Sequence, residues 1–423
     1  MLLKILKNLS QKIIAKHQPR IILVAGSMGK TLAREAIYTV LSHKFKVRRN
    51  LDNYESKLGI FLTIIGAKMP DDNKLPDLPF KMGRMPWLDW PLIMMQAIFL
   101  LIQKNKEYPE VLILEIENEN IEFINNFLSA DMLVLTSIGF SNSEFTTNIQ
   151  REQDAILSLA NNLKTDAKII INYDDDNLVK IIPKINKEIL KFSIGKEGSD
   201  LRALEIQYNF QKENNLEFDK LSGIQARLDY KGSLVPIFLP NLLGIQYLYA
   251  TLTTVAAGIV MEINQVELSE VCKNLEQIRG RFSLLKGVKN TIIIDDSYNS
   301  SPRSCVLALD LARQIPIQKK ARRFAILGDM LELGGSSEKL HREVGEHVAQ
   351  YKFNKLIAIG ERSRDILRQA QKTMNKDNIF HFANSLEACR FVQDQIREGD
   401  LILIKGSRSM EMEKIVDEIK SYH

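Results

Sequence analysis

A short glycine loop that is followed by lysine and threonine stands near the start of this 423-residue chain. The loop covers residues 26–31 with the letters GSMGKT, after an aliphatic run and before a helical pattern. Glycines let backbone N–H groups close on phosphate oxygens, and a helix N-terminus adds partial positive charge. Lys30 supplies a cation and the Thr31 hydroxyl can bind Mg²⁺. Val24 stands five positions before Gly29, so this is a shortened loop, G-x-x-G-K-T. The loop predicts a nucleotide phosphate site, because an ordinary strand–turn–helix connection does not require a lysine at this position.

Three further polar turns follow apolar, strand-like runs in the C-terminal third of the chain. The first carries Asp295 and Asp296, the second carries Asp329 with His341 downstream, and the third reads KGSRS over residues 405–409. Each turn alone could be a capped strand end. Ligands collect at the carboxyl ends of strands in open α/β sheets, so three such turns together predict a ligand site.

The composition is that of a soluble intracellular enzyme. Hydrophobic residues make up 45% and charged residues 26%, which are ordinary globular values. The net charge of +5 permits an anionic substrate without demanding nucleic acid. The three cysteines are far apart and odd in number, which favours neither a disulfide framework nor a zinc site.

Two apolar segments bear on location. Residues 1–17 form a basic amphipathic pattern without the long apolar core of a secretory signal. Residues 90–102 are apolar but short for a membrane span, and Asp89 and Lys104 flank them. We expect a cytoplasmic protein with no integral membrane segment, in which residues 90–102 form a buried or partner-facing helix. Peripheral membrane contact is the alternative.

The order of apolar runs predicts an α/β protein with two sheets. Strand-like runs alternate with helical ones, which favours parallel sheets with crossover helices. In the first unit the runs are residues 21–24, 111–114, 132–136 and 168–171. Residues 189–240 alternate apolar and polar positions, which fits a small antiparallel elaboration. Two helical patterns follow at residues 244–260 and 265–275, and the second unit has strand-like runs at residues 291–294, 324–327, 355–359 and 401–404.

The boundary between the two units is expected near Arg281. Residues 1–281 are then a P-loop-type ATP-binding domain with a parallel sheet, in which residues 1–20 contribute a short N-terminal helix. Residues 282–423 are a Rossmann-like, doubly wound domain of ordinary size.

Six motifs carry a resemblance to a known family. They read AGSMGKT, INYDDDN, RGRF, DDSYNSSP, ILGDMLELG with a downstream histidine, and LILIKGSRSMEMEKIV. In type and order they resemble the Mur ligases, ATP-dependent amide-forming enzymes of peptidoglycan synthesis. The chain is most similar to the type that adds D-alanyl-D-alanine to a UDP-muramoyl-tripeptide. The resemblance runs from about Arg20, so the family's first domain, which holds the UDP-sugar end of the substrate, is expected to be missing.

The resemblance implies roles for individual residues. Two of them, Glu115 after residues 111–114 and Thr31, would bind Mg²⁺, with Glu117 as an outside candidate for the metal. The ATP-binding residues would be Gly26, Ser27, Gly29, Lys30 and Thr31 at the phosphates, Arg281 from the domain junction, and Asp296 at the ribose. The residues with catalytic roles would be Lys30, Glu115 and Lys405, and those facing the substrate would be Asn299, Ser407 and Arg408. Such ligases activate a carboxylate as an acyl phosphate, which an amine then attacks.

The chain departs from the family pattern at several positions. Asn142 stands where the family has a metal-binding histidine. Gln153 replaces a lysine that becomes carbamylated and helps to bind a second Mg²⁺. Residues 244–249, which include Tyr249, replace an adenine-contacting segment, and residues 53–59 replace an asparagine-rich turn near the substrate.

These observations leave more than one function open. The leading hypothesis is an ATP- and Mg²⁺-dependent, ADP-forming ligase that joins a carboxylate to an amine, acting on a small-molecule or peptide-nucleotide substrate. A partner protein could supply the missing substrate-binding domain. The departures favour the alternative of a degenerate nucleotide-binding protein with a scaffold or regulatory role. A simple P-loop NTPase is a third reading, which the elaborate C-terminal turns disfavour.

Overall fold

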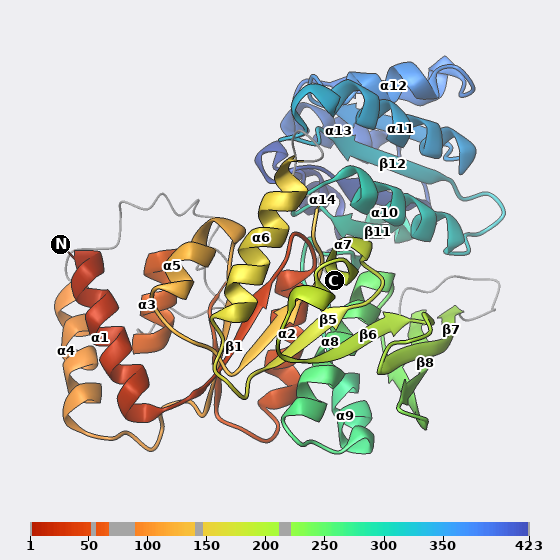
Figure 1. Cartoon of the computed structure of the whole chain (residues 1–423). Coiled ribbons are helices and arrows are strands. Elements are labelled where there is room, and N and C mark those ends of the chain that lie inside the picture. The colour runs from red at the N-terminus through yellow and green to blue at the C-terminus, as the bar shows by residue number, and fades with distance from the viewer. Residues whose placement is uncertain (1, 52–55, 67–88, 140–146, 211–220, 422–423) are drawn as a thin grey trace.

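The computed structural model describes residues 2–51, 56–66, 89–139, 147–210 and 221–421. The first part of the chain builds a nine-stranded sheet with the order β2-β3-β1-β4-β5-β6-β7-β8-β9 (Figure 1). Its strands are β1 (Arg20–Ala25), β2 (Val47–Arg49), β3 (Val111–Glu115), β4 (Met132–Leu135), β5 (Lys168–Asn172), β6 (Glu188–Ile194), β7 (Leu201–Phe210), β8 (Leu221–Tyr230) and β9 (Ser233–Leu239).

Helices cover both faces of this sheet. They are α1 (Leu2–His17), α2 (Lys30–Leu41), α3 (Lys57–Ile65), α4 (Asp89–Ile102), α5 (Ile121–Asn125), α6 (Thr147–Asn161), α7 (Asp176–Val179), α8 (Ile245–Val260) and α9 (Gln265–Val271). Along β1, Ile22 and Val24 join the core beneath α2 and α8, whereas Ile21, Leu23 and Ala25 join the core beneath α1, α3 and α4. Alternate side chains of a strand point to opposite faces, so β1, which is apolar at every position after Arg20, needs both layers.

The predicted antiparallel elaboration is correct only in its second half. β6 pairs in parallel with β5 and with β7, so the parallel part of the sheet continues past residue 189. The antiparallel ladder begins between β7 and β8 and continues to β9. These strands extend the first sheet instead of forming a separate one. The short edge strand β2 has only three residues and no clear apolar alternation, and the sequence did not reveal it.

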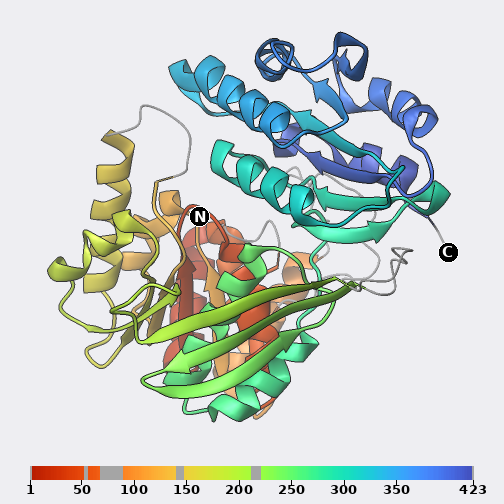
Figure 2. The same ribbon diagram turned by 90° about the vertical axis from the view of Figure 1, so that its right-hand side faces the viewer.

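The last part of the chain builds a six-stranded sheet with the order β10-β11-β15-β12-β13-β14. All of its neighbouring pairs are parallel except β10 with β11. The strands are β10 (Ser283–Lys286), β11 (Ile292–Asp296), β12 (Arg323–Gly328), β13 (Lys355–Ile359), β14 (Ile379–Phe382) and β15 (Leu401–Lys405). The helices are α10 (Pro302–Gln314), α11 (Ser337–Gln350), α12 (Arg364–Ala370), α13 (Ser385–Gln395) and α14 (Glu413–Ile419). The expected α/β class with two largely parallel sheets is confirmed, and Figure 2 shows the two sheets as separate layers.

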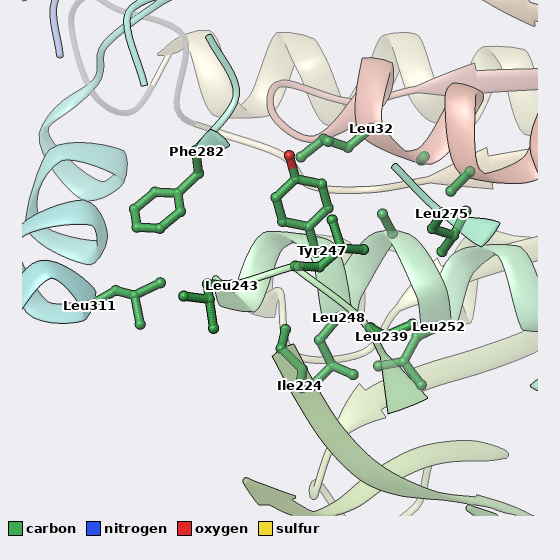
Figure 3. Close-up of a cluster of buried hydrophobic side chains, with 14 of the residues drawn as sticks. Leu32, Ile224, Leu239, Leu243, Tyr247, Leu248, Leu252, Leu275, Phe282 and Leu311 are labelled. Carbon is green, nitrogen blue, oxygen red and sulfur yellow. The ribbon is translucent and has the colours of Figure 1, made fainter. Parts of the chain in front are cut away.

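A shared apolar cluster joins the two units. Tyr247 of α8 lies between Leu32 of α2 and the pair Phe282 and Leu311, which belong to the second part of the chain (Figure 3). The Tyr247 hydroxyl accepts a hydrogen bond from the Ile278 backbone N–H at 3.1 Å and donates one to the Arg281 carbonyl at 2.9 Å. Tyr247 therefore fixes the segment that leads from the first sheet to the second. The division at Arg281 stays a prediction about domains.

Candidate active site

The phosphate loop lies at the carboxyl end of β1, between β3 on one side and β4 on the other. The connection after β1 leads to β2 on one side, whereas the connection after β3 crosses to β4 on the other side. Open α/β sheets bind ligands where the direction of the connections changes in this way. Gly26 has φ of +137°, and a Cβ there would stand 2.3 Å from Thr136 Oγ1. Gly29 precedes α2 in a left-handed conformation with φ of +79°. Both positions therefore require glycine, and the loop backbone closes tightly over β4.

Lys30 and Thr31 begin α2 and point toward two carboxylates at the carboxyl end of β3, those of Glu115 and Glu117. The Lys30 ammonium lies 3.1 Å from Glu117 Oε2. The Thr31 hydroxyl donates a hydrogen bond to Glu115 Oε1 at 3.1 Å. Ser27 belongs to the same loop, and its backbone N–H donates to the Ser137 carbonyl at 3.0 Å. The loop residues that the sequence singled out are thus brought together with Glu115.

Glu115 is 1% exposed, and its charge is balanced by cations. Burial raises the pKa of the Glu115 carboxyl above its ordinary value, while Arg34, Lys30, the Thr31 hydroxyl and Arg281 act in the opposite direction. Arg34 Nη1 lies 3.0 Å from Glu115 Oε2. Nothing in the sequence distinguishes Arg34, because a charged residue one turn into a helix resembles any solvated helix position.

The backbone of Glu115 is held as firmly as its side chain. The side chain of Asn50, which is fully buried, donates to the Glu115 carbonyl at 2.9 Å and accepts from the Glu115 N–H at 2.8 Å. This pair of bonds fixes where β3 ends and where the carboxylate projects. Asn50 was also missed, since it follows a three-residue strand that the sequence did not reveal.

Arg281 brings the second unit to the phosphate loop. Its guanidinium donates a hydrogen bond to Thr31 Oγ1 at 3.1 Å and lies 3.8 Å above the centre of the Tyr298 ring. The Ser301 hydroxyl, at the start of α10, lies 3.8 Å from Met28 Sδ. Residues that are 250 or more positions apart therefore meet at one place, as the sequence analysis expected for Arg281.

Asp296 and Lys405 form an ion pair at the carboxyl ends of two neighbouring strands. β11 and β15 pair in parallel with Asp296 opposite Lys405, and the ammonium lies 2.6 Å from Asp296 Oδ2. Lys405 is 2% exposed and also donates to the Asn299 carbonyl at 2.9 Å. Burial raises the pKa of Asp296, and Lys405 opposes that shift. The structure therefore joins two residues to which the resemblance gave separate roles, at the ribose and in catalysis.

Asp295, the neighbour of Asp296, ties this turn to the segment before β10. It is fully buried and accepts hydrogen bonds from the Gly280 N–H at 3.1 Å and from the Ser297 hydroxyl at 2.5 Å. Its role is to hold the backbone next to Arg281. Of the two carboxylates that the sequence singled out together, Asp296 pairs with the Lys405 ammonium, whereas Asp295 accepts from backbone N–H groups and a hydroxyl.

The turn after β12 is linked to the turn after β15. The Ser407 hydroxyl accepts from the Leu331 N–H at 2.9 Å, and the Ser407 N–H donates to the Asp329 carbonyl at 3.0 Å. Asp329 Oδ1 accepts from the Ser363 N–H at 2.7 Å. Asp329 and Ser407 therefore hold the two turns together. Arg408 is exposed, and its guanidinium donates a hydrogen bond to Glu413 Oε1 at 2.6 Å.

His341 supports the same turn in a defined tautomer. The Met330 N–H donates to His341 Nε2 at 3.0 Å, so the ring proton lies on Nδ1, 2.7 Å from the Ser337 carbonyl. The ring is fully buried, and burial lowers its pKa below the ordinary value.

Acidification is therefore expected to destabilise the fold through His341. The native state holds the ring neutral, whereas the unfolded chain takes up a proton as the pH falls below about 6.5. The stabilisation is complete above that pH and is lost as the pH falls toward the lower native pKa. In urea unfolding, His341→Gln should be less stable than the unmodified chain at pH 7.5, and the difference should shrink at pH 5.5. A difference that stays constant or widens would contradict a neutral native His341.

The sequence analysis also missed Glu152 on α6. Its carboxylate accepts hydrogen bonds from the Ser27 hydroxyl at 3.0 Å and from the Gly139 N–H at 2.8 Å, and Asn118 donates to its other oxygen. Gln153 instead donates to the Asn177 carbonyl at 2.9 Å. On α6 the side chain that reaches the phosphate loop is thus that of Glu152, and the replacement of a carbamylated lysine by Gln153 stays a prediction. Asn142 lies outside the described residues, as do residues 53–55.

Residues 244–249 replace the adenine-contacting segment of the family, and their tyrosine side chains form hydrogen bonds within the protein. Tyr249 donates a hydrogen bond to Asp174 Oδ2 at 3.1 Å, and burial raises its pKa above the ordinary value. Tyr247 holds the segment before Arg281, as described above. In this chain, Tyr247 at the start of α8 therefore positions the backbone of Arg281, near the junction of the two sheets.

Comparisons with known proteins agree with this arrangement. The Mur ligase middle domain matches residues 95–243, and the glutamate ligase domain of Mur ligases matches residues 280–408. The chain belongs to the Mur ligase family. The family resemblance inferred from the six motifs is thereby confirmed.

Relatives of one type cover almost the whole of this Mur ligase chain. The UDP-N-acetylmuramoyl-tripeptide--D-alanyl-D-alanine ligase of Bacillus subtilis is 24% identical over 98% of the chain and 79% of its own length. The enzyme of that name from Rickettsia prowazekii is 26% identical over 94% of the chain and 77% of its own length. A MurF ligase from Thermotoga maritima in complex with ADP superposes with a TM-score of 0.75 at 20% identity, over 99% of this chain and 83% of that one. The structural likeness establishes the shared fold.

Proposed function

We propose that this Mur ligase is an ATP-dependent, ADP-forming ligase that joins a carboxylate to an amine through an acyl phosphate. The cell-wall precursor pathway in the cytoplasm is the proposed setting, with D-alanyl-D-alanine as the amine, by analogy with the named relatives. The observation that carries the proposal is the bond between Arg281 and Thr31, which joins the phosphate loop to the second unit. A ligase must hold ATP, a carboxylate and an amine together, whereas a simple NTPase needs only the loop.

The residues of the site supply the charge that this chemistry needs. Two anions, the γ-phosphate and the substrate carboxylate, must approach each other. Lys30 and Arg281 lie beside the phosphate loop and would offset that repulsion. The backbone N–H groups at the start of α2 would orient the phosphates, because those of Ser27 and Met28 already donate to Ser137. The Tyr298 ring beside Arg281 would help to exclude water from the acyl phosphate.

The oxygen ligands present at the loop fit Mg²⁺. The Thr31 hydroxyl and the Glu115 carboxylate are 3.1 Å apart and buried, and Mg²⁺ in ATP sites takes one or two protein oxygens together with phosphate oxygens and water. Within the ranges that the structure describes, no three His, Cys, Asp or Glu side chains are grouped so as to hold a metal ion by themselves. The bound ion would neutralise phosphate charge.

The decisive measurement is ADP release with and without each substrate. Release that requires both D-alanyl-D-alanine and a muramoyl-peptide carboxylate, with formation of the amide product, is the expected result. Release without either substrate would instead identify an NTPase.

The alternative is a nucleotide-binding protein that no longer ligates. The ion pair between Glu115 and Arg34 favours it, because a carboxylate whose charge is already balanced binds a cation less strongly. Binding of ATP without ADP release in the presence of all substrates would support this alternative.

We include in the proposal a partner protein that holds the UDP end of the acceptor. The contacts described for this site lie at the phosphate loop and at the junction between the two sheets, where ATP would bind. If the UDP end is held elsewhere, the purified chain should show equal KM values for UDP-muramoyl-tripeptide and for the muramoyl-tripeptide without UDP. A clearly lower KM for the UDP form would show that the chain binds UDP by itself.

Activity is expected to be indifferent to bicarbonate. Gln153 cannot be carbamylated, and its side chain bonds the Asn177 carbonyl in place of the phosphate loop. Ligation rates should be equal, within error, in bicarbonate-depleted buffer and in buffer with added bicarbonate. A several-fold loss on depletion that bicarbonate restores would place a carbamylated lysine in the site.

A further inference from the structure

Two adjoining helices carry most of the large apolar side chains that the described part of the chain exposes. Eight of the twelve lie on α1 and α4. They are Leu2, Leu3 and Ile5 on α1, and Leu92, Met95, Ile98, Phe99 and Ile102 on α4, and together they define the α1–α4 apolar face. Exposure on α4 reaches 65% at Met95 and 77% at Ile102. Scattered exposed apolar residues are normal, but a concentration of this kind marks an interaction site.

The helix α4 is apolar on all sides. Ile93, Ala97 and Leu100 pack into the core, at the spacing of one helix face, and the exposed residues occupy the opposite face. A helix that is apolar all round is normally covered by protein or lipid. At 14 residues α4 is short for a bilayer span, and none of the helices among the described residues has the length and apolar character to cross a membrane.

Positive charge lies close to the α1–α4 apolar face in the sequence. Helix α1 carries Lys4, Lys7, Lys12 and Lys16 and no acidic residue, and Lys104 and Lys106 follow α4 closely. Asp89, the first residue of α4, is the one acidic residue in the two helices. An apolar surface with a basic surround is complementary to anionic lipid headgroups above an acyl layer. A second copy of the chain would instead bring like charges together.

The two helices are fixed to each other, so they present one surface. The Lys16 ammonium bonds the Leu101 carbonyl at 2.5 Å, and His17 Nε2 lies 3.0 Å from the Leu100 carbonyl. Figure 1 shows α1 and α4 side by side at the edge of the first unit, on the side away from the six-stranded sheet. A flat partner could therefore cover them without closing the junction where Arg281 meets Thr31.

We propose that the α1–α4 apolar face docks the protein on the surface of an anionic bilayer, with the apolar side chains entering the headgroup boundary and the lysines pairing with phosphates. Membrane docking depends on the surface of α1 and α4 alone, so its test is independent of the ligase activity.

Vesicle sedimentation tests the proposal directly. The full chain should sediment with vesicles of phosphatidylcholine and phosphatidylglycerol, and roughly tenfold less with phosphatidylcholine alone or in high salt. The double variant Met95→Gln/Phe99→Gln should lose roughly tenfold or more in vesicle affinity, since two inserted side chains become polar. The variant Lys4→Gln/Lys12→Gln should weaken binding to the anionic vesicles.

Matched controls lie on the other unit. Leu386→Gln alters a side chain on α13 that is 69% exposed, and Lys372→Gln/Lys376→Gln removes the same charge from an exposed stretch, so both variants should sediment as the unmodified chain does. Each variant should melt at the unmodified temperature, because only exposed positions change. Absence of sedimentation with either vesicle would overturn the proposal. A dimer that Met95→Gln/Phe99→Gln dissociates would also overturn it, in favour of a second copy as the occupant.

Discussion

Replacement of Lys30 by alanine is expected to lower ATP affinity by about 10- to 100-fold, because hydrogen bonds to charged groups contribute about 1.5–3 kcal/mol each. The fold should tolerate the change. Lys30 lies at the start of α2 and pairs with Glu117, whose side chain is 44% exposed, so the carboxylate left behind is solvated. An ion pair with a solvated partner contributes only about 0–1 kcal/mol to stability. The buried Glu115 carboxylate, which Lys30 also stabilises, keeps Arg34 at 3.0 Å as its partner. Titration with ATP, together with a thermal melt without nucleotide, measures both quantities.

The matched control for that experiment is Glu117→Gln. This variant breaks the same ion pair but keeps the Lys30 ammonium. If the phosphate assignment is correct, Glu117→Gln should retain ATP affinity within a few-fold while Lys30→Ala loses it. Equal losses in the two variants would mean that the ion pair, and not the phosphate contact, sets the affinity. A large fall in melting temperature for Lys30→Ala would favour a structural role.

The phosphate loop and the order of the elements could be predicted from the sequence, because both depend on local pattern. Residues 26–31 follow a strand that is buried on both faces, and the glycines at positions 26 and 29 have the conformations that such a loop demands. Arg281 was singled out through the RGRF motif, and its guanidinium lies 3.1 Å from Thr31 Oγ1. Its contact with ATP stays a prediction. The short β2 and the parallel pairing of β6 could not be predicted, since three residues show no period and register depends on partners far along the chain.

The residues that surround the phosphate loop could not be predicted from the sequence, for a physical reason. Arg34, Asn50 and Glu152 surround the loop through contacts that the fold creates. Each is an ordinary polar residue in its own segment, and no spacing distinguishes it. On α6 the phosphate loop is contacted by Glu152, whereas Gln153 faces Asn177, because neighbouring helix positions point about 100° apart. A motif alignment that is uncertain by one residue therefore cannot decide which side chain enters the site.

Asp296 and Lys405 form a buried ion pair, so replacement of either residue is expected to lower the stability of the fold. The resemblance assigns Asp296 to the ribose, so Asp296→Ala should weaken ATP binding and little else. In the structure, however, Lys405 is 2% exposed and its ammonium lies 2.6 Å from Asp296 Oδ2. Removal of one partner from a buried ion pair typically costs about 3–5 kcal/mol, because a charge is left without compensation. Asp296→Ala is therefore expected to destabilise the fold by about that amount.

A double variant separates this structural cost from a direct contact with ATP. Asp296→Leu/Lys405→Met removes both charges and fills similar volume, so its free energy of unfolding in urea should recover much of what Asp296→Ala loses. Ligation should not recover, since the turn after β15 loses its cation and the Asn299 carbonyl loses its donor. If instead Asp296→Ala keeps the stability of the unmodified chain and lowers only ATP affinity, the ion pair adds little to the stability of the fold, and Asp296 contacts the ribose as the family resemblance implies.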